Sequence, residues 1–314
     1  MRVSASPKVH GAQIGLLQVC AAGVLWGTGG LVVTVLHERD GLGAMTVSAW
    51  RMLLAAVALV TFALVTGRSR AVVETIQTHP VLAILVGFGT AAYQALYFVS
   101  VLIVGVSVAT VVSLGLAPIL ATVWEQFRAR TWPTWRQVGV LQAALVGLVL
   151  ITSFAGHGSS APGGQPGVGL LLAVAAGATY AATTVLGHAL AQRVDSVALT
   201  TSATVVGAVV LTPFLAIAAI AGEPVLPRDP ASLALLVYLG VATMALSYGL
   251  LYAGLRTTSG SAATVATLVE PLSAALLAVL LLGERLAWPA VVGGVLILAA
   301  VLALHPNQRH PAPA

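Results

Sequence analysis

Long apolar runs are the feature that most constrains this chain. Ten of them, each about 20 residues long, follow one another with short polar connections between them. A helix needs about 20 consecutive apolar residues to cross the hydrocarbon core of a bilayer. Because lipid offers the backbone no hydrogen-bond partners, such runs must form helices or a closed barrel, and the lack of period-2 alternation selects helices. The runs therefore predict an all-α integral membrane protein.

The composition supports this prediction. The 314 residues are 59% hydrophobic and only 7% charged, and the mean hydropathy is +1.00. A water-soluble globule of this length has too few interior positions for so many apolar side chains. We therefore predict ten transmembrane helices. Their approximate ranges are 14–36, 44–66, 79–101, 105–125, 135–154, 167–190, 196–221, 231–253, 259–282 and 286–304.

The chain also repeats itself. A stretch that begins with Gly15-Leu16-Leu17 recurs 154 residues later as Gly169-Leu170-Leu171, and further matches follow with a shift of one residue. Each copy holds five predicted spans, and an odd number inserts the second copy upside down relative to the first. Inverted repeats are typical of secondary transporters. The matched pairs are Gly15/Gly169, Gly23/Gly177, Trp26/Tyr180, Gly87/Gly240, Thr90/Thr243 and Pro118/Pro271.

The repeat predicts the domain organisation, with two inverted five-helix repeats joined by a linker rich in Gly, Ser and Pro. The linker is expected outside the cytoplasm, and the Pro- and His-rich tail is expected to be unstructured. The expected segments are 1–13 (cytoplasmic N-terminal segment), 14–155 (first repeat), 156–166 (linker), 167–304 (second repeat) and 305–314 (cytoplasmic tail).

The distribution of basic residues predicts the orientation. With the N-terminus inside, ten Lys and Arg residues fall on the cytoplasmic side and three fall on the other side. This asymmetry favours a multi-pass protein of the inner (plasma) membrane with both termini in the cytoplasm. The formal charge of +5 is therefore mostly topological, and it does not indicate a nucleic-acid partner. The ten are Arg2, Lys8, Arg68, Arg70, Arg128, Arg130, Arg136, Arg193, Arg256 and Arg309, and the three are Arg39, Arg228 and Arg285.

Two charged residues lie well inside predicted spans. Arg51 is seven residues into the second span, roughly 10 Å deep at 1.5 Å per residue, and Glu270 is close to the middle of the ninth. Ionisable residues are costly there and usually mark a substrate or proton site. The alternatives are a snorkelling or carbonyl-capping role for Arg51 and a packing role for a protonated Glu270. Pro271 should also free a backbone carbonyl near Thr267.

Aromatic and amide residues fall at similar depth. They predict an apolar pocket with a few polar groups between helices, although membrane-interface or packing roles are the alternative. That alternative is favoured for Phe98 and Tyr252 near span ends, and His188 is interpreted as an interfacial histidine in preference to a proton relay. The predicted substrate-binding residues are Trp26, Arg51, Tyr93, Gln94, Tyr97, Tyr180, Tyr248 and Glu270, with Glu270 also the candidate for proton coupling.

The sequence lacks the motifs expected of a disulfide-linked protein, a metalloprotein, an enzyme or an ATP-driven pump. Cys20 is the only cysteine, so an intrachain disulfide and a cysteine-based metal cluster are excluded. Apart from Glu270, the Asp and Glu residues are scattered over loops and span ends, without the clustered carboxylates or metal-ligand spacings of a membrane enzyme acting on lipid-linked substrates. No phosphate-binding Gly-Lys loop suggests ATP-driven transport. We expect no enzymatic activity, catalytic residue, metal or cofactor.

These residues resemble the drug/metabolite transporter superfamily, and specifically its ten-helix EamA-type permeases. The strongest similarity is Glu270-Pro271-Leu272, followed by Gly283-Glu284-Arg285-Leu286 and by Gly293-Gly294 in the last span; Trp26-Gly27 and Ala49-Trp50-Arg51 also match. The first copy departs from the pattern, with Ala129-Arg130-Thr131 in place of Gly283-Glu284-Arg285. The resemblance implies two inverted repeats around a central cavity, and a secondary carrier that exports amino acids or other small metabolites without a bound cofactor.

We therefore expect a secondary active transporter that exports small organic metabolites such as amino acids, by alternating access around a midplane cavity. Its partners are a small-molecule substrate, the lipid bilayer and, as a candidate, protons. An integral-membrane enzyme, a multidrug-type efflux carrier, a channel and a structural membrane protein are the alternatives. The sequence leaves the substrate, the direction and the oligomeric state open.

Overall fold

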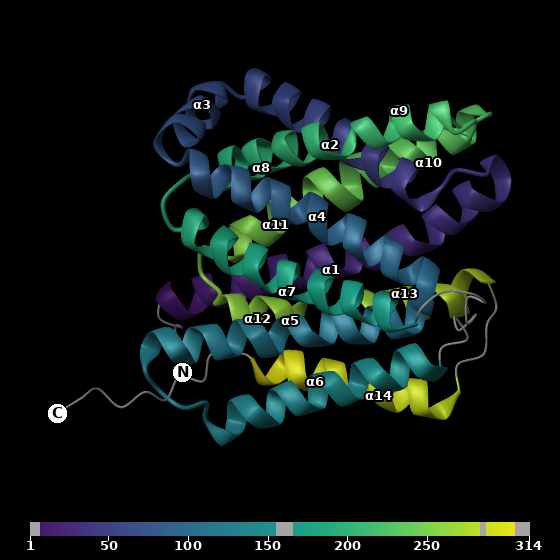
Figure 1. The fold of residues 1–314 in the computed structure, drawn as a ribbon. Helices are drawn as coiled ribbons and strands as arrows, with labels where there is room; N and C mark the ends of the chain where they lie inside the picture. Colours follow the sequence, from purple (N-terminus) through teal and green to yellow (C-terminus); the bar gives the residue numbers. More distant parts are fainter. Residues whose placement is uncertain (1–6, 155–165, 283–286, 305–314) are drawn as a thin grey trace.

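The computed structural model describes residues 7–154, 166–282 and 287–304, and within these ranges the chain is helical without β-strands (Figure 1). The helices are α1 (Pro7–Asp40), α2 (Ala44–Val65), α3 (Ser69–Thr78), α4 (Pro80–Val104), α5 (Val106–Ala129), α6 (Trp135–Phe154), α7 (Pro166–Ala191), α8 (Ser196–Leu211), α9 (Pro213–Ile220), α10 (Pro230–Gly240), the π-helix η1 (Val241–Leu246), α11 (Ser247–Gly254), α12 (Gly260–Ala266), α13 (Val269–Leu282) and α14 (Trp288–Ala303).

The ten predicted spans are present. Within the described ranges, nine helical segments are long and apolar enough to cross a membrane, and α14 is a tenth apolar helix of 16 residues. The predicted fold, an all-helical membrane protein with ten spans, is confirmed. Most of the predicted linker, the predicted tail and Glu284-Arg285 lie outside the described residues.

Three spans are interrupted, and the sequence indicated only some of the interruptions. The seventh breaks at Pro213, the eighth contains η1, and the ninth breaks between α12 and α13 just before Pro271. Pro118, the repeat mate of Pro271, lies inside an unbroken α5. The short helix α3 was not predicted. It has only ten residues and half of them are polar, so the sequence does not show it as a membrane span.

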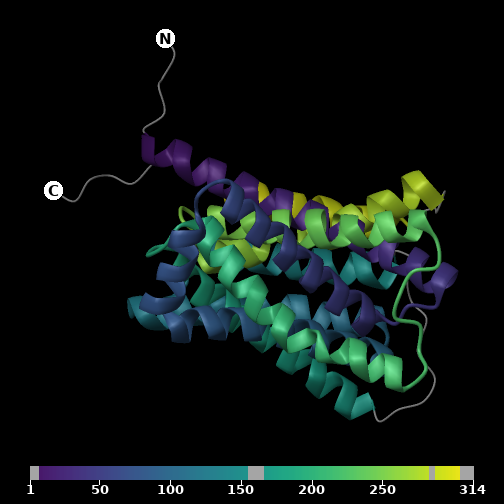
Figure 2. The same ribbon diagram turned by 90° about the horizontal axis from the view of Figure 1, so that it is seen from above.

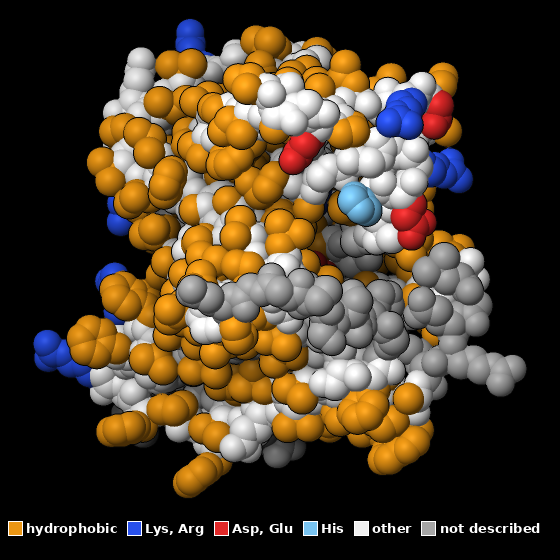
Figure 3. All heavy atoms as spheres, turned by 45° about the vertical axis from the view of Figure 1, so that its right-hand side comes forward, with side chains coloured by type: hydrophobic (Ala, Val, Ile, Leu, Met, Phe, Trp, Pro, Cys, Tyr) orange, Lys and Arg blue, Asp and Glu red, His pale blue; other side chains and the backbone are white. Residues whose placement is uncertain are grey.

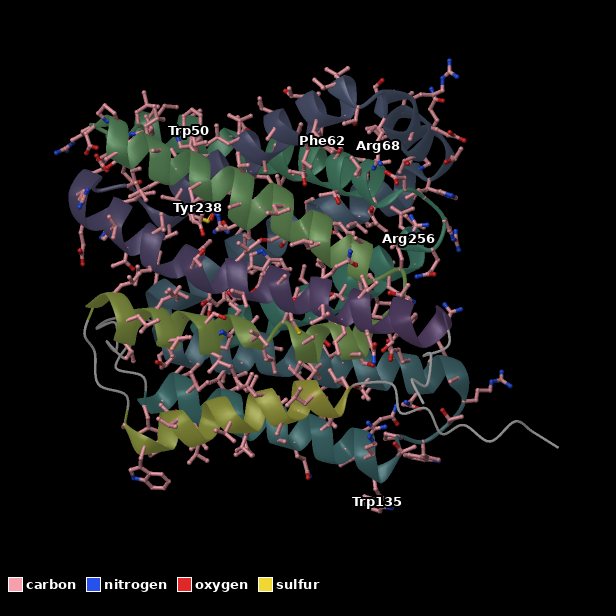
Figure 4. All side chains as sticks on the ribbon, turned by 180° about the vertical axis from the view of Figure 1, so that it is seen from behind. Trp50, Phe62, Arg68, Trp135, Tyr238 and Arg256 are labelled. Carbon is pink, nitrogen blue, oxygen red and sulfur yellow. The ribbon has the colours of Figure 1, made fainter. Side chains whose placement is uncertain are left out.

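The spans lie side by side, and each crosses the whole bundle (Figures 1 and 2). We call the end where α1 begins and α14 ends the proximal end, and the end where α1 ends and α2 begins the distal end. Figure 4 labels Arg68 and Arg256 at the proximal end, Trp50 toward the distal end, and Trp135 pointing away from the bundle. Hydrophobic side chains cover much of the surface, as expected for a face in contact with lipid (Figure 3).

Contacts between the two halves of the chain follow a paired pattern. Helix α4 packs on α7 and α8, while α11 packs on α1, and α10 with η1 packs on α2. Further large contacts between the halves join α5 to α7, α1 to α13, α6 to α14 and α2 to α8, and the last two pairs lie at opposite sides of the bundle in Figure 1. Most of the large helix–helix contacts therefore join one half to the other.

Glycines at matched positions make these contacts close. A Cβ on Gly23 would lie 3.2 Å from the carbonyl oxygen of Thr267, and one on its repeat mate Gly177 would lie 2.6 Å from that of Ser113. Small residues let membrane helices approach until their backbones touch. The sites at Gly87 and Gly240 repeat the pattern, with built Cβ atoms 2.4 Å from the Ala203 oxygen and 2.5 Å from the Leu54 Cβ.

Side chains also connect the helices at the proximal end. Arg68, just before α3, forms a 3.5 Å ion pair with Asp195, which also accepts hydrogen bonds from the first amides of α8. Glu125 of α5 accepts hydrogen bonds from the amide and the hydroxyl of Ser261 at the start of α12. Thr257 donates to the Gly11 carbonyl at 3.0 Å. The proximal end is therefore closed by polar contacts between the halves.

The contact between α6 and α14 offers a test of this packing. A Cβ on Gly147 would lie 2.6 Å from the Gly293 carbonyl oxygen, so the methyl group of Gly147→Ala must displace the backbone of α14. We expect the variant to lose about 1–3 kcal/mol of stability, measured as a lower apparent Tm in detergent. Gly139→Ala in the same helix meets open space and is the matched control. Equal Tm values for the two variants would contradict the contact.

Candidate functional site

A cavity of about 750 Å³ lies between the two halves of the chain. Its lining extends from Glu38, near the distal end of α1, to Trp26 and Tyr248 deeper in the bundle. Figure 3 turns the distal end toward the reader and shows the surface hollowed there. The cavity is therefore reached from the distal end.

All eight residues predicted to bind substrate line this cavity. They come from six spans and from both halves of the chain, so only the folded bundle brings them together. Their binding role stays a prediction. They are Trp26 of α1, Arg51 of α2, Tyr93, Gln94 and Tyr97 of α4, Tyr180 of α7, Tyr248 of α11 and Glu270 of α13.

Aromatic rings form two contacting groups around the cavity. Tyr93 stacks on Tyr180 with ring centroids 5.0 Å apart and on Tyr97 at 6.0 Å. Trp26 meets Tyr248 edge-on at 5.1 Å. Tyr93 and Tyr97 are four residues apart, which places both on one face of α4 and allows their rings to stack. Contacts of this kind fix ring orientation and give the cavity rigid walls.

Hydrogen bonds anchor two of these tyrosines. Tyr180 donates to the Thr267 hydroxyl at 3.0 Å, and the hydroxyls of Tyr97 and Thr110 are 2.7 Å apart. Thr267 lies in the turn between α12 and α13, where its carbonyl accepts from the Glu270 amide at 2.9 Å. The carbonyl that Pro271 was expected to free is thus used by a tighter turn, and the expectation of an unpaired carbonyl there was wrong.

Arg51 points into the bundle. Its Nη2 donates to the Thr243 hydroxyl at 3.1 Å and to the Met244 sulfur at 3.4 Å, while its Nε is buried without a partner among the described residues. The guanidinium is therefore held inside the bundle by η1. Its neighbour Trp50 instead donates to the Val225 carbonyl at 2.6 Å, which ties α2 to the segment before α10.

Glu270 presents its carboxylate to the same cavity. Among the described residues, no side chain or backbone group donates a hydrogen bond to this carboxylate. No cation of the described residues, Arg51 included, lies within ion-pair distance of it. Gly27 lets α1 lie against the backbone at this point, because a Cβ there would be 2.5 Å from the Glu270 carbonyl oxygen. The cavity wall thus holds one cation and one carboxylate that do not neutralise each other by direct contact.

The floor of the cavity is tightly packed. Tyr93, Tyr180 and Tyr248 also line a void of about 10 Å³ on the proximal side, together with Leu251 and Tyr252. Tyr252 is fully buried and packs against Gly187, where a Cβ would lie 2.8 Å from its ring. A void of this size holds at most one water molecule, so the cavity does not continue to the proximal end.

Several lining residues were not among those predicted. Met244 reaches the cavity from η1, and a π-helix leaves no mark in hydrophobic periodicity. Phe98 lines the cavity although interface packing was favoured for it, whereas Tyr252 is buried packing as favoured. The other unpredicted lining side chains include Glu38, Ser107, Thr110, Leu114 and Thr152.

His188 lies away from the cavity. Its Nδ1 is 2.9 Å from the Leu255 carbonyl, which also accepts from the Gln192 amide, so these side chains serve the end of α11. In the described ranges no group of three or more His, Cys, Asp and Glu side chains is placed to hold a metal ion.

Comparisons with known proteins agree with this architecture. The profile of the EamA-like transporter family matches residues 13–153 and again residues 167–304. The chain belongs to the EamA-like transporter family. This family is part of the drug/metabolite transporter superfamily, so the resemblance noted in the sequence is confirmed.

The relatives within this family are themselves named as transporters. The chain is 30% identical over 295 residues to the uncharacterised transporter YwfM of Bacillus subtilis (strain 168), covering 93% of this chain and 94% of that one. It is 25% identical over 303 residues to the uncharacterised inner membrane transporter YicL of Salmonella typhimurium, covering 95% and 97%. A crystal structure with 19% identity superposes with a TM-score of 0.76, covering 92% and 95%, and shares the fold. The chain is a multi-pass membrane protein of a transporter family.

Cysteine labelling tests the one-ended cavity. In a Cys20→Ser background, Ser107→Cys places a thiol on the cavity wall and Thr184→Cys places one beside the void under the floor, where Thr184 is 2% exposed. We expect a polar thiol reagent to modify Ser107→Cys in detergent at least 10-fold faster, since reagents reach only accessible thiols. Equal rates at the two positions would show that the floor is open.

Proposed function

We propose that this EamA-like protein is a secondary transporter of small organic solutes that carry both a positive and a negative group, with amino acids as the leading class. One observation carries the proposal: the cavity wall bears an arginine and a glutamate that do not pair with each other. Burying an unpaired charge is costly, so such residues usually mark a ligand or ion site. A zwitterion supplies both missing partners.

The surrounding groups support a ligand of this type. Arg51 donors suit a carboxylate, since guanidinium and carboxylate match in geometry. The Glu270 carboxylate suits an ammonium group, and the rings of Trp26, Tyr93 and Tyr248 supply apolar walls and cation–π contacts. The cavity of about 750 Å³ is in the usual range for small-molecule sites.

Alternating access is the mechanism we propose, with the halves as inverted five-helix repeats. Helix α1 runs from left to right in Figure 1 and its counterpart α7 runs from right to left. The paired glycine contacts between the halves support the same relation. In inverted repeats the two halves can exchange conformations, which closes the distal end and opens the proximal end around a fixed site.

We further propose that the proximal end faces the cytoplasm of a cell bounded by an inner membrane, and that the net direction is export. The excess of basic residues at the proximal end, including Arg68, Arg128 and Arg256, supports this orientation. The cavity then faces outward, which is the state in which an exporter releases its substrate. Glu270 is the candidate for coupling this step to protons.

Solute counterflow in proteoliposomes tests the transport proposal. We expect saturable exchange of an amino acid by the wild-type protein and a loss of about 10- to 100-fold in apparent affinity for Arg51→Gln, because a hydrogen bond to a charged group contributes about 1.5–3 kcal/mol. Glu74→Gln on the exposed helix α3 is the control and should exchange as the wild type does. Absence of exchange for every solute class would refute transport by this cavity.

Accumulation of substrate under an imposed pH gradient tests whether Glu270 couples transport to protons. If Glu270 carries the coupled proton, Glu270→Gln should retain exchange in the absence of a pH gradient but should no longer accumulate substrate when a gradient is imposed. The same accumulation by wild type and Glu270→Gln would exclude this residue as the coupling site.

Labelling of intact cells tests the orientation. In the Cys20→Ser background, Ser107→Cys should react with a membrane-impermeant thiol reagent added outside, because the cavity that it lines opens at the distal end. A cysteine replacing Arg70 at the proximal end should react only after the cells are opened. The reverse pattern would invert the proposed topology.

A further inference from the structure

Most buried polar atoms without a partner lie away from the cavity, but three belong to its wall. In the described ranges seven buried side-chain nitrogen and oxygen atoms lack a hydrogen bond, and they include both amide atoms of Gln94 and the Nε of Arg51. Native proteins rarely leave such atoms unpaired, so each one calls for a physical reason. Among the residues that the structure describes, Gln94 alone has two such atoms.

Gln94 is almost fully buried beside the cavity. The side chain is 6% exposed and lines the cavity, yet its amide nitrogen and oxygen are screened from water. Solvent therefore does not offset the cost of leaving both groups unpaired. The terminal torsion of glutamine is broad, so a small rotation turns the amide toward a ligand in the cavity.

The second half of the chain does not share this feature. By the repeat offset Gln94 corresponds to Ser247, whose hydroxyl donates to the Ala242 carbonyl at 2.9 Å. The nearby matched pair behaves alike in both halves, since Thr90 and Thr243 each donate to a carbonyl of their own helix. The unpaired amide is thus particular to α4 and is not a demand of the repeated fold.

We infer that Gln94 is a specificity-determining residue whose carboxamide pairs with an amide group of the transported solute. The inference rests on the proposed transport function. A carboxamide presents an N–H donor and a C=O acceptor side by side, and a primary carboxamide matches both, whereas the N–H and C=O of a trans peptide bond point in opposite directions. Combined with the charges of Arg51 and Glu270, this selects zwitterions that carry a primary carboxamide, namely amino acids with a side-chain carboxamide.

The cavity size agrees with such ligands. Its volume of about 750 Å³ leaves room beyond the two charged groups for an uncharged polar part. A site built to hydrogen-bond a polar group discriminates strongly against an analogue that lacks it, because the buried groups of the site then stay unpaired. Two hydrogen bonds to a neutral amide correspond to a preference of about 10- to 100-fold.

Counterflow with matched solute pairs tests the inference. The pairs are L-glutamine with L-methionine, and L-asparagine with L-leucine, and the second member of each pair is similar in size and lacks the carboxamide. In the full-length wild-type protein the amide member of at least one pair should exchange with an apparent affinity at least 10-fold higher than its partner. The variant Gln94→Met, similar in volume and without a polar amide, should bring this ratio to about one.

Each other outcome has a defined meaning. A wild-type ratio near one, or a preference that survives in Gln94→Met, overturns the inference while transport stands. Exchange of other solutes but none of these four also overturns it, whereas absence of exchange for every solute refutes the proposed function itself. An apparent Tm of Gln94→Met at or above that of wild type is expected, since the variant removes unpaired buried groups; a fall of several degrees would instead assign Gln94 a structural role and overturn the inference.

Discussion

Backbone-to-backbone contact between the two halves is the constraint on which the rest of the structure depends. Lipid tails are as apolar as leucine, so burying apolar side chains gives membrane helices little reason to associate, and close packing must supply the attraction. Matched glycines such as Gly87 and Gly240 bring helices of one half against helices of the other. The cavity exists because these contacts draw six spans together around a space that they do not fill.

The site also depends on how its two buried charges are held in place. Thr243 and Met244 of η1 hold the Arg51 guanidinium, and Gly27 allows α1 to lie against the backbone of Glu270. Because both charged groups are attached to packed helices, they do not approach each other within ion-pair distance. Two fixed opposite charges across an aromatic-walled space are the arrangement on which the proposed zwitterion site rests.

Much of this could be predicted from the sequence, for reasons that are physical. Span length is dictated by bilayer thickness, so the ten helices were found, with every end but the start of the first within about four residues, and the high cost of charge in lipid singled out Arg51 and Glu270. Both now line the cavity.

What the sequence could not predict depends on three-dimensional packing. The π-helix η1, which brings Met244 to the cavity, comes from one extra residue in a hydrogen-bonded turn and leaves the apolar pattern unchanged. The carbonyl of Thr267 found a partner because the chain tightened into a turn, whereas Pro118 in the same repeat position left α5 continuous. The two amide atoms of Gln94 are identified as unpaired only when all neighbours are placed.

The short helix α12 is anchored at both of its ends by the rest of the bundle. Glu125 of the first half binds its first turn, and Tyr180 holds Thr267 at its end, directly before the segment that carries Glu270. Its counterpart in the first half is a part of α5, which has no such joint. The two halves are therefore unequal at this position. The first half has one continuous helix, and the second half has two helices joined by a turn, with Glu270 just past the turn. In the alternating access proposed above, opening and closing of the two ends then need not be mirror images, even though the chain repeats itself.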